Sequence, residues 1–308
     1  MTGPALAGAA VQLIGGTAAA PLLPGLTQHW KARLQGRPGP SPLQPYRELA
    51  RLWRKSTVDV AGTTAVYRLA PAVTAAGVLA AVAVVPVASA AAGFGLGHDM
   101  LAVIGLLAVG RFALALSAWD VASGFSLMGA SRELTVSVFA EVTLLLSLAV
   151  VALLSGSTNL TAMIAATAGG HPWSGPVLPL GAAAFGLVLV AETGRQPFDN
   201  PDTHLELTMI HEGPLLEYAG RDLAYLQWAA AARHWLVLVL AATVFLPHPA
   251  GTWPQLLALP AVLAGMCGLL AVTETLVAKM RMLAAPRLLL LAAAVALLGV
   301  VAGLAGVS

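Results

Sequence analysis

The fifty residues from Val142 to Ala191 contain no aspartate, glutamate, lysine or arginine. About 20 apolar residues are enough to cross the hydrocarbon core of a membrane as a helix, so this run is longer than one crossing requires. The rest of the 308-residue chain is similar, with 58% hydrophobic and only 10% charged residues, whereas soluble domains carry about 25% charge. This composition excludes a water-soluble enzyme, a disordered protein and a nucleic-acid-binding protein. It predicts an all-α, polytopic membrane protein.

Uncharged runs predict about eight transmembrane helices, plus cytoplasmic amphipathic helices, in a single membrane domain over residues 1–308. The expected spans lie near 4–26, within 69–98, at 101–119 and 134–155, between 176 and 191, twice within 234–273 with a break at 247–251, and at 288–308.

The positions of the cations predict the orientation. If the N-terminus is outside, 15 of the 16 lysines and arginines fall in or beside four inner segments, at about 28–65, 119–133, 192–226 and 278–287. The exception is Arg111, which lies within a span. Cytoplasmic loops carry an excess of lysine and arginine, so this pattern places both termini outside and the two long loops, 28–65 and 192–226, in the cytoplasm.

The first cytoplasmic loop contains a stretch, 46–55, in which apolar and basic residues alternate at helical spacing. One interpretation is an interfacial helix held by anionic lipid. The other is a docking surface for a soluble partner, with Arg47, Arg51 and Arg54 in contact with it. The two roles are compatible.

The second long cytoplasmic loop is acidic. Half of the fourteen acids of the chain fall within 31 residues: Glu192, Asp199, Asp202, Glu206, Glu212, Glu217 and Asp222. Asn200 followed by Pro201 predicts the start of a helix with Asp202 and Glu206 on one face, and His204 and His211 share another face.

This acidic loop has two interpretations. It can be a solvated acidic loop, or it can pack against other parts of the protein, as its leucines and isoleucine favour. In the second case, partly buried acids beside histidines can exchange protons near neutral pH.

Arg111 and Glu141 lie inside predicted spans, each roughly 10–12 Å from the inner helix end at 1.5 Å per residue. A charge at that depth is costly, so we expect them to pair or to face a hydrated cavity. They form either a structural ion pair or part of a proton path from Glu192 to Glu141. Glu274 extends that path or, as we favour, caps a helix at the interface beside Lys279.

Enzyme motifs are absent. None of the three lysines follows a glycine, so there is no P-loop, and His211-Glu212 lacks the second histidine of a zinc-protease helix. Cys267 is the only cysteine, which excludes a cysteine-ligated cluster held by this chain alone. We therefore expect no catalytic residue and no metal site in this chain.

The acidic loop resembles a known signature. The stretch from Glu192 to Gly220, ETGRQPFDNPDTHLELTMIHEGPLLEYAG, is similar to the signature loop of the quinone-site membrane subunit of respiratory complex I. It resembles still more closely the homologous small membrane subunit of group 4 membrane-bound nickel-iron hydrogenases, of the formate hydrogenlyase and hydrogenase-4 type. Arg111-Phe, Ala118-Trp-Asp120, 129–133 and Glu141 match that family in the same order.

The resemblance implies a membrane anchor for a peripheral nickel-iron hydrogenase arm, which contributes an acidic proton path in a prokaryotic inner membrane. It implies no cofactor in this chain, because the nickel-iron centre and iron-sulfur clusters belong to the large and small hydrogenase subunits. Antiporter-like membrane subunits are further expected partners, and nucleic acid is not. The implied path residues are Glu141, Glu192, Asp199, Asp202, Glu206, Glu212, Glu217, Arg111, Asp120 and Glu133. The implied docking residues are Arg195, His204, His211, Arg47, Arg51 and Arg54.

Two other functions remain open at this point. One is the quinone-site membrane subunit of a complex I, although His204 and His211 replace residues that are expected of a quinone enzyme. The other is a stand-alone ion or solute transporter with its site among Arg111, Glu141 and Glu192.

Overall fold

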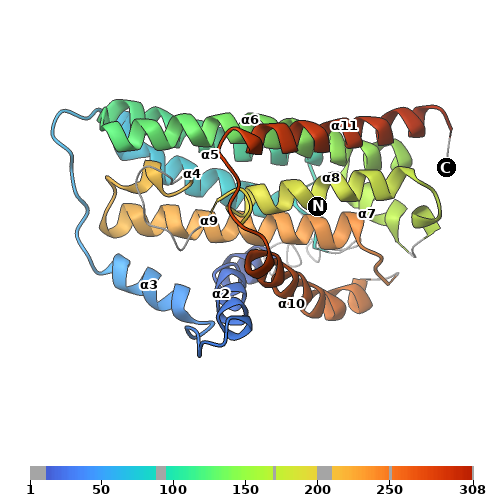
Figure 1. The fold of residues 1–308 in the computed structure, drawn as a ribbon, viewed down its shortest axis with the longest axis horizontal. Helices are drawn as coiled ribbons and strands as arrows, with labels where there is room; N and C mark the ends of the chain where they lie inside the picture. The colour runs from blue at the N-terminus through green and yellow to red at the C-terminus, as the bar shows by residue number, and fades with distance from the viewer. Residues whose placement is uncertain (1–11, 88–94, 169–170, 200–209, 250–251, 307–308) are drawn as a thin grey trace.

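The computed structural model describes residues 12–87, 95–168, 171–199, 210–249 and 252–306, and every regular element in these ranges is a helix. Figure 1 shows long helices lying roughly side by side along the longest axis of the molecule. The elements are α2 Leu22–Leu34, α3 Gln44–Trp53, α4 Ala65–Val84, α5 Asp99–Val121, α6 Gly124–Ser155, α7 Leu160–Thr167, η1 His171–Ser174, α8 Val177–Glu192, η2 Gly213–Leu215, α9 Gly220–Leu240, η3 Ala241–Phe245, α10 Thr252–Leu276 and α11 Ala284–Leu304.

Six of the described helices are long and apolar enough to cross a membrane: α4, α5, α6, α9 continuing through the π-helix η3, α10 and α11. The shorter helix α8 is also apolar. These helices confirm the predicted all-α, polytopic membrane fold. The predicted first span, 4–26, lies partly outside the described residues, and its described part is a helix over 12–19 that turns at 20–21 and continues as α2.

Two helices begin earlier than predicted. α6 starts at Gly124 and not at 134, and α9 starts at Gly220 and not at 234. At 1.5 Å per residue, α6 is about 48 Å long, well beyond the roughly 30 Å of a hydrocarbon core. Both helices therefore extend past the membrane, and a search for uncharged runs misses these extensions because they carry charges such as Arg132 and Arg221.

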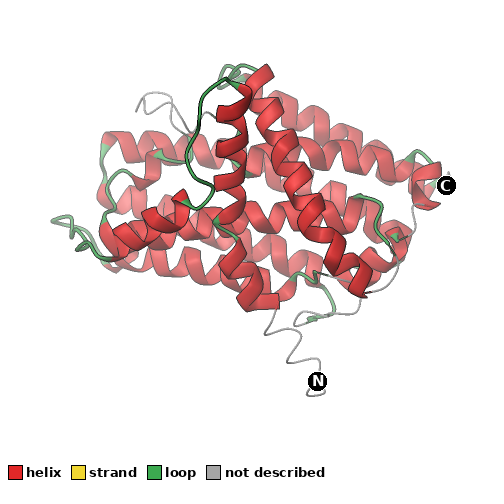
Figure 2. Ribbon diagram, turned by 90° about the horizontal axis from the view of Figure 1, so that it is seen from below, coloured by secondary structure: helices red, strands yellow, loops and turns green. Residues whose placement is uncertain are grey.

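The central helix of the bundle is α9. It contacts α2, α3, α4, α8 and α10. In its most apolar stretch of 18 residues, 89% is buried inside the chain. α2 and α10 pack on each other, and Figure 1 shows them below the other long helices. In Figure 2 the same helices cross the near face of the bundle. α3 lies beside α9, with Trp53 edge-on to Tyr225 at 5.2 Å between ring centroids.

The segments that we expected in the cytoplasm contact one another. Asp120 accepts hydrogen bonds from the backbone N–H groups of Thr64 (2.8 Å) and Tyr67 (3.1 Å), and so joins the end of α5 to the start of α4. The Tyr67 hydroxyl donates to the carbonyl of Glu217 (2.8 Å). Met280 N–H donates to the carbonyl of residue 197 (3.0 Å). These bonds fix the loops around the ends of the spans, where the buried charges lie.

Candidate functional site

The eight residues that end α8 and follow it, 192–199, carry three buried charges: Glu192, Arg195 and Asp199. The chain turns sharply after the helix, since Gly194 has a positive φ of 63° and the N–H of Asp199 donates to the carbonyl of Arg195 (3.1 Å). The turn sends the three side chains to three separate ion clusters. We name each cluster after its shared residue.

The first is the Arg111 cluster. The Arg111 guanidinium lies 2.8 Å (Nη1) from Glu192 Oε1 and 3.2 Å (Nε) from Glu141 Oε1. Arg111 and Glu192 are buried, while the Glu141 side chain is 28% exposed. The structure thus confirms that Arg111 and Glu141 pair within the spans, and it adds Glu192 as a second carboxylate on the same cation.

The second is the Asp199 cluster. Asp199 accepts from Lys279 Nζ (2.8 Å) and from the backbone N–H groups of Ile210 (3.3 Å) and His211 (3.2 Å), and its Oδ2 lies 3.2 Å from His211 Nδ1. Burial alone would raise the pKa of Asp199, but His211 and Lys279 hold that pKa well below its usual range. Burial alone would lower the pKa of His211, whereas its bond to Asp199 and the nearby Glu133 raise the pKa above its usual value.

The third is the Glu274 cluster. Glu274 Oε2 lies 2.9 Å from Lys31 Nζ on α2, and its Oε1 lies 2.9 Å from Arg195 Nη1. All three residues are buried, so the preferred interpretation of Glu274 as an interfacial cap is wrong. Arg195, which was expected at a docking surface, is instead inside the protein. The packing of α2 on α10 creates this cluster, and spacing along the chain does not reveal that packing.

Most of the described part of the acidic loop packs against the protein, although Leu216 is exposed. Ile210 is 1% exposed, and the backbone at Gly213 crosses α6 so closely that a Cβ on Gly129 would lie 2.6 Å from the Gly213 Cα. Glu212 and Glu217 are half-buried, and Glu212 lines the cavity described below. Asp202, His204 and Glu206, with the predicted helix that carries them, lie outside the described residues.

The remaining predicted residues form none of the ion pairs of the three clusters. Asp120 holds the start of α4, as described above. Glu133 is buried and interacts electrostatically with His211. Arg47 and Arg51 are exposed on α3 and Arg54 is exposed just after its end, and the predicted helical form of this stretch is confirmed.

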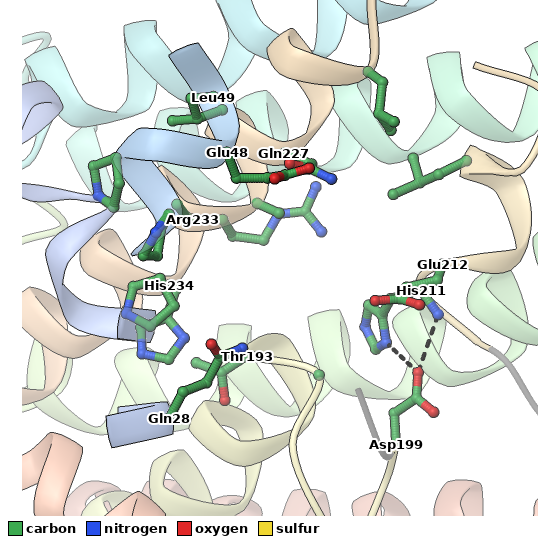
Figure 3. Close-up of a pocket in the computed structure, with 18 of the residues that line it drawn as sticks. Gln28, Glu48, Leu49, Thr193, Asp199, His211, Glu212, Gln227, Arg233 and His234 are labelled. Atoms are coloured by element: carbon green, nitrogen blue, oxygen red, sulfur yellow. Dashed lines mark hydrogen bonds and ion pairs between the residues drawn. The ribbon is translucent and has the colours of Figure 1, made fainter. Parts of the chain in front are cut away.

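A cavity of about 820 Å³ lies between α2, α3, α9 and the segment after α8 (Figure 3). Its walls include residues of all three clusters: Glu192 of the first, Asp199 and His211 of the second, and Arg195 of the third. They also include Arg233 and His234 of α9, which are 8% and 4% exposed. Sequence reasoning treated Arg233 only as a helix-end charge. The apolar residues on both sides of it, AAAA before and WLVLVL after His234, were the signal that it is inside a buried helix.

This arrangement of ionisable residues suits proton transfer more than the making or breaking of covalent bonds. Asp199, His211 and Glu192 lie on the cavity wall, and Glu141 in the span shares Arg111 with Glu192. The three carboxylates are each held by a cation of the same chain. Such a series can relay protons in a membrane interior, whereas one isolated pair cannot. In the part of the chain that the structure describes, no three His, Cys, Asp or Glu side chains are grouped to hold a metal ion.

The fold and the site together define a multi-span helical membrane protein with buried ionisable residues at one end of its spans. The sequence model of the family described as "NADH dehydrogenase" matches residues 8–303. The chain therefore belongs to this family.

Similar curated proteins come from two kinds of complex. "Hydrogenase-4 component C" of Escherichia coli K12 is 35% identical over 74% of this chain and 71% of the relative. "Formate hydrogenlyase subunit 4" of the same organism is 36% identical over 75% and 74%. A subunit of an NADH-quinone oxidoreductase from Rhodopseudomonas palustris BisB5 is 31% identical over 71% and 70%. The chain is thus homologous to membrane subunits of hydrogenase and respiratory complexes.

A solved structure shares the fold. A chain of the membrane-bound sulfane sulfur reductase, an archaeal respiratory membrane complex, matches with a TM-score of 0.84 over 97% of this chain and 99% of that chain. The two sequences are 19% identical, so this likeness concerns the fold alone.

Proposed function

We propose that this chain is an integral subunit of a membrane-bound hydrogenase complex of the formate hydrogenlyase type, in a prokaryotic inner membrane. It is not catalytic alone, anchors the peripheral nickel-iron hydrogenase arm and contributes a proton path. The two Escherichia coli relatives support the type of complex. The observation that carries the proton path is the Arg111 cluster, in which one buried guanidinium holds two carboxylates of different helices.

The proposed path begins at the cavity and ends in the spans. Protons enter beside His211 and Asp199, whose hydrogen bond joins an imidazole with a raised pKa to a carboxylate. They then reach Glu192 and pass across Arg111 to Glu141. We also assign Glu133, Glu212, Glu217, Asp202, Glu206 and Asp120 to this proton path.

We propose that protons leave this subunit at Glu141. Its half-buried side chain shares a face of α6 with Val138, Val142 and Leu145, which are 38–55% exposed. A carboxylate facing lipid is costly, so we assign this face to the antiporter-like membrane subunits. The hydrogenase large and small subunits, which carry the nickel-iron centre and iron-sulfur clusters, dock at the cytoplasmic end, where the basic face of α3 is exposed.

The direct test is purification of the affinity-tagged chain from native membranes in mild detergent. We expect cluster-bearing hydrogenase subunits to co-purify and the preparation to evolve or consume hydrogen. A preparation without hydrogen chemistry that shows quinone-dependent, inhibitor-sensitive turnover would reject the proposal.

The cavity favours a second candidate function, the quinone-site membrane subunit of a complex I. About 820 Å³ is large enough for a ligand, and Arg233 and His234 can donate hydrogen bonds to a quinone carbonyl. The relatives from NADH-quinone oxidoreductases agree with this candidate. Photo-crosslinking with an azidoquinone separates the two candidates, since only the second predicts labelling of the 210–216 and α9 walls.

A further inference from the structure

Three of the four carboxylates on the cavity wall are bound by cations of the same chain. Glu192 is held by Arg111, Asp199 by Lys279, and Glu48 by Arg51 at the next turn of α3. Ion pairing inside the chain therefore accounts for these three acids.

Arg233 is different. No hydrogen bond or ion pair joins it to any residue that the structure describes, and its Nε is buried without a partner. The charged groups that act on it do so only through space: Glu192 and Glu141, which already share Arg111, together with Glu133 and Arg111 itself. The neighbouring His234 also has a buried ring nitrogen, Nε2, without a partner. Figure 3 shows the Arg233 guanidinium directed into the open centre of the cavity.

A guanidinium with a buried Nε that has no hydrogen-bond partner, and with a charge that no ion pair compensates, is unfavourable. The groups that satisfy its planar fork are carboxylates and phosphates, which accept two parallel hydrogen bonds. A neutral carbonyl would satisfy the hydrogen bonds and leave the charge uncompensated. The Arg233 side of the cavity therefore fits an oxyanion.

The rest of the cavity fits a lipid. Its wall is apolar along Pro21, Pro24 and Leu49, and along Leu215 and Leu223. It lies beside α3, an amphipathic helix whose exposed basic face is typical of helices at the level of lipid headgroups. Glu212 projects from the wall across from Arg233 (Figure 3), and a carboxylate has room for several hydrogen-bond donors.

We propose that the cavity binds the headgroup of a zwitterionic phospholipid, such as phosphatidylethanolamine. The phosphate lies on Arg233, the ammonium faces Glu212, and the acyl chains follow the apolar wall. A headgroup with both charges leaves the net charge of the cavity unchanged, whereas an inorganic phosphate would add negative charge beside Glu192 and Glu212. This inference rests on the proposed function, in which no quinone needs the cavity.

The test compares the purified complex with its Arg233→Gln variant, after both are washed with detergent until loosely bound lipid is removed. Lipid extraction and native mass spectrometry count the retained phospholipids. The control is Arg221→Gln, which removes an exposed arginine from the same helix. We expect the wild type and the control to retain one more phosphatidylethanolamine than Arg233→Gln. We also expect the variant to rebind this lipid from nanodiscs about tenfold more weakly or worse.

Three probes are added to washed complex, with protection of α9 from hydrogen exchange as the readout: phosphatidylethanolamine nanodiscs, phosphatidylglycerol nanodiscs and inorganic phosphate. The proposal is supported if only phosphatidylethanolamine protects α9 from hydrogen exchange and if this protection is lost in Arg233→Gln. Equal protection by inorganic phosphate, or equal lipid retention in Arg233→Gln, overturns it while leaving the hydrogenase assignment intact. Displacement of the lipid by a quinone with quinone-dependent turnover would overturn both.

Discussion

Replacing Arg111 by glutamine gives the sharpest test of the buried charges. The guanidinium is 2.8 Å from Glu192, whose side chain is fully buried, and 3.2 Å from Glu141, whose side chain is 28% exposed. Removal of one partner of a buried ion pair typically costs about 3–5 kcal/mol, because a charge stays behind without compensation. We expect Arg111→Gln to lower the free energy of unfolding by this amount, since it leaves Glu192 alone in the interior.

Glu192 and Glu141 should differ in how much the loss of their ion pair lowers the free energy of unfolding. Glu141→Gln should cost about 1 kcal/mol or less, because water or a partner reaches this side chain and because Arg111 keeps Glu192. Combining Arg111→Gln with Glu192→Gln should cost less than the sum of the two single changes, by about 1–3 kcal/mol, because the charge that the double variant leaves unpaired, Glu141, is partly exposed and not fully buried.

The assay is unfolding of the full chain in mixed micelles with increasing dodecyl sulfate, followed by tryptophan fluorescence. The matched control is Arg221→Gln, which removes an exposed arginine of α9 and should change stability by about 0.5 kcal/mol or less. If Arg111→Gln unfolds like this control, or if the double variant is strictly additive, the buried pair is not formed as described.

The Glu274 cluster, the packing of α6 on η2 and the bond between His211 and Asp199 lead to three more predictions. Glu274→Gln should lower the free energy of unfolding by about 3–5 kcal/mol in the same assay, because it leaves two buried cations together, and a change below about 1 kcal/mol would contradict the cluster. Gly129→Ala should cost about 1–3 kcal/mol, because the new Cβ meets the backbone of η2, whereas Gly105→Ala enters open space and should not destabilise. The pKa of His211 is raised, so its bond to Asp199 stabilises the loop fully below about pH 6.5 and is lost as the pH rises through the raised value. The pKa of Asp199 is lowered, so its contribution to the stability of the loop persists above about pH 4. Protection of residues 210–216 from hydrogen exchange should therefore fall as the pH rises through the raised pKa of His211. Asp199→Asn should abolish this dependence of protection on pH.

Much of the fold could be predicted from the sequence, because membrane spans leave a strong signal. The absence of charge located α5, α8, α10 and α11 closely, since crossing lipid requires about 20 apolar residues whatever the neighbours are. The same signal failed for the starts of α6 and α9. These helices continue outside the membrane, where charge is no longer excluded.

The site could be predicted only in part. The depths of Arg111 and Glu141 matched along two spans, and this match predicted that they either pair or face a hydrated cavity; the structure shows the pairing. The Glu274 cluster joins α2, α10 and the segment after α8, whose proximity depends on tertiary packing that no spacing encodes. Arg233 was overlooked because a cation near a helix end is usually solvated, and only the surrounding helices show that this one is buried.

The central claim, a proton path that ends at Glu141, is tested most directly by the charge moved per reaction. The complex would be reconstituted in liposomes as wild type, as Glu141→Gln and as the control Asp59→Asn, which removes an exposed carboxylate. A voltage-sensitive dye would report the membrane potential while hydrogen is measured in the same vessel. We expect Glu141→Gln to retain all subunits and to lose most of the dye response per hydrogen molecule, with the control unchanged. An unaltered response in Glu141→Gln would contradict the account.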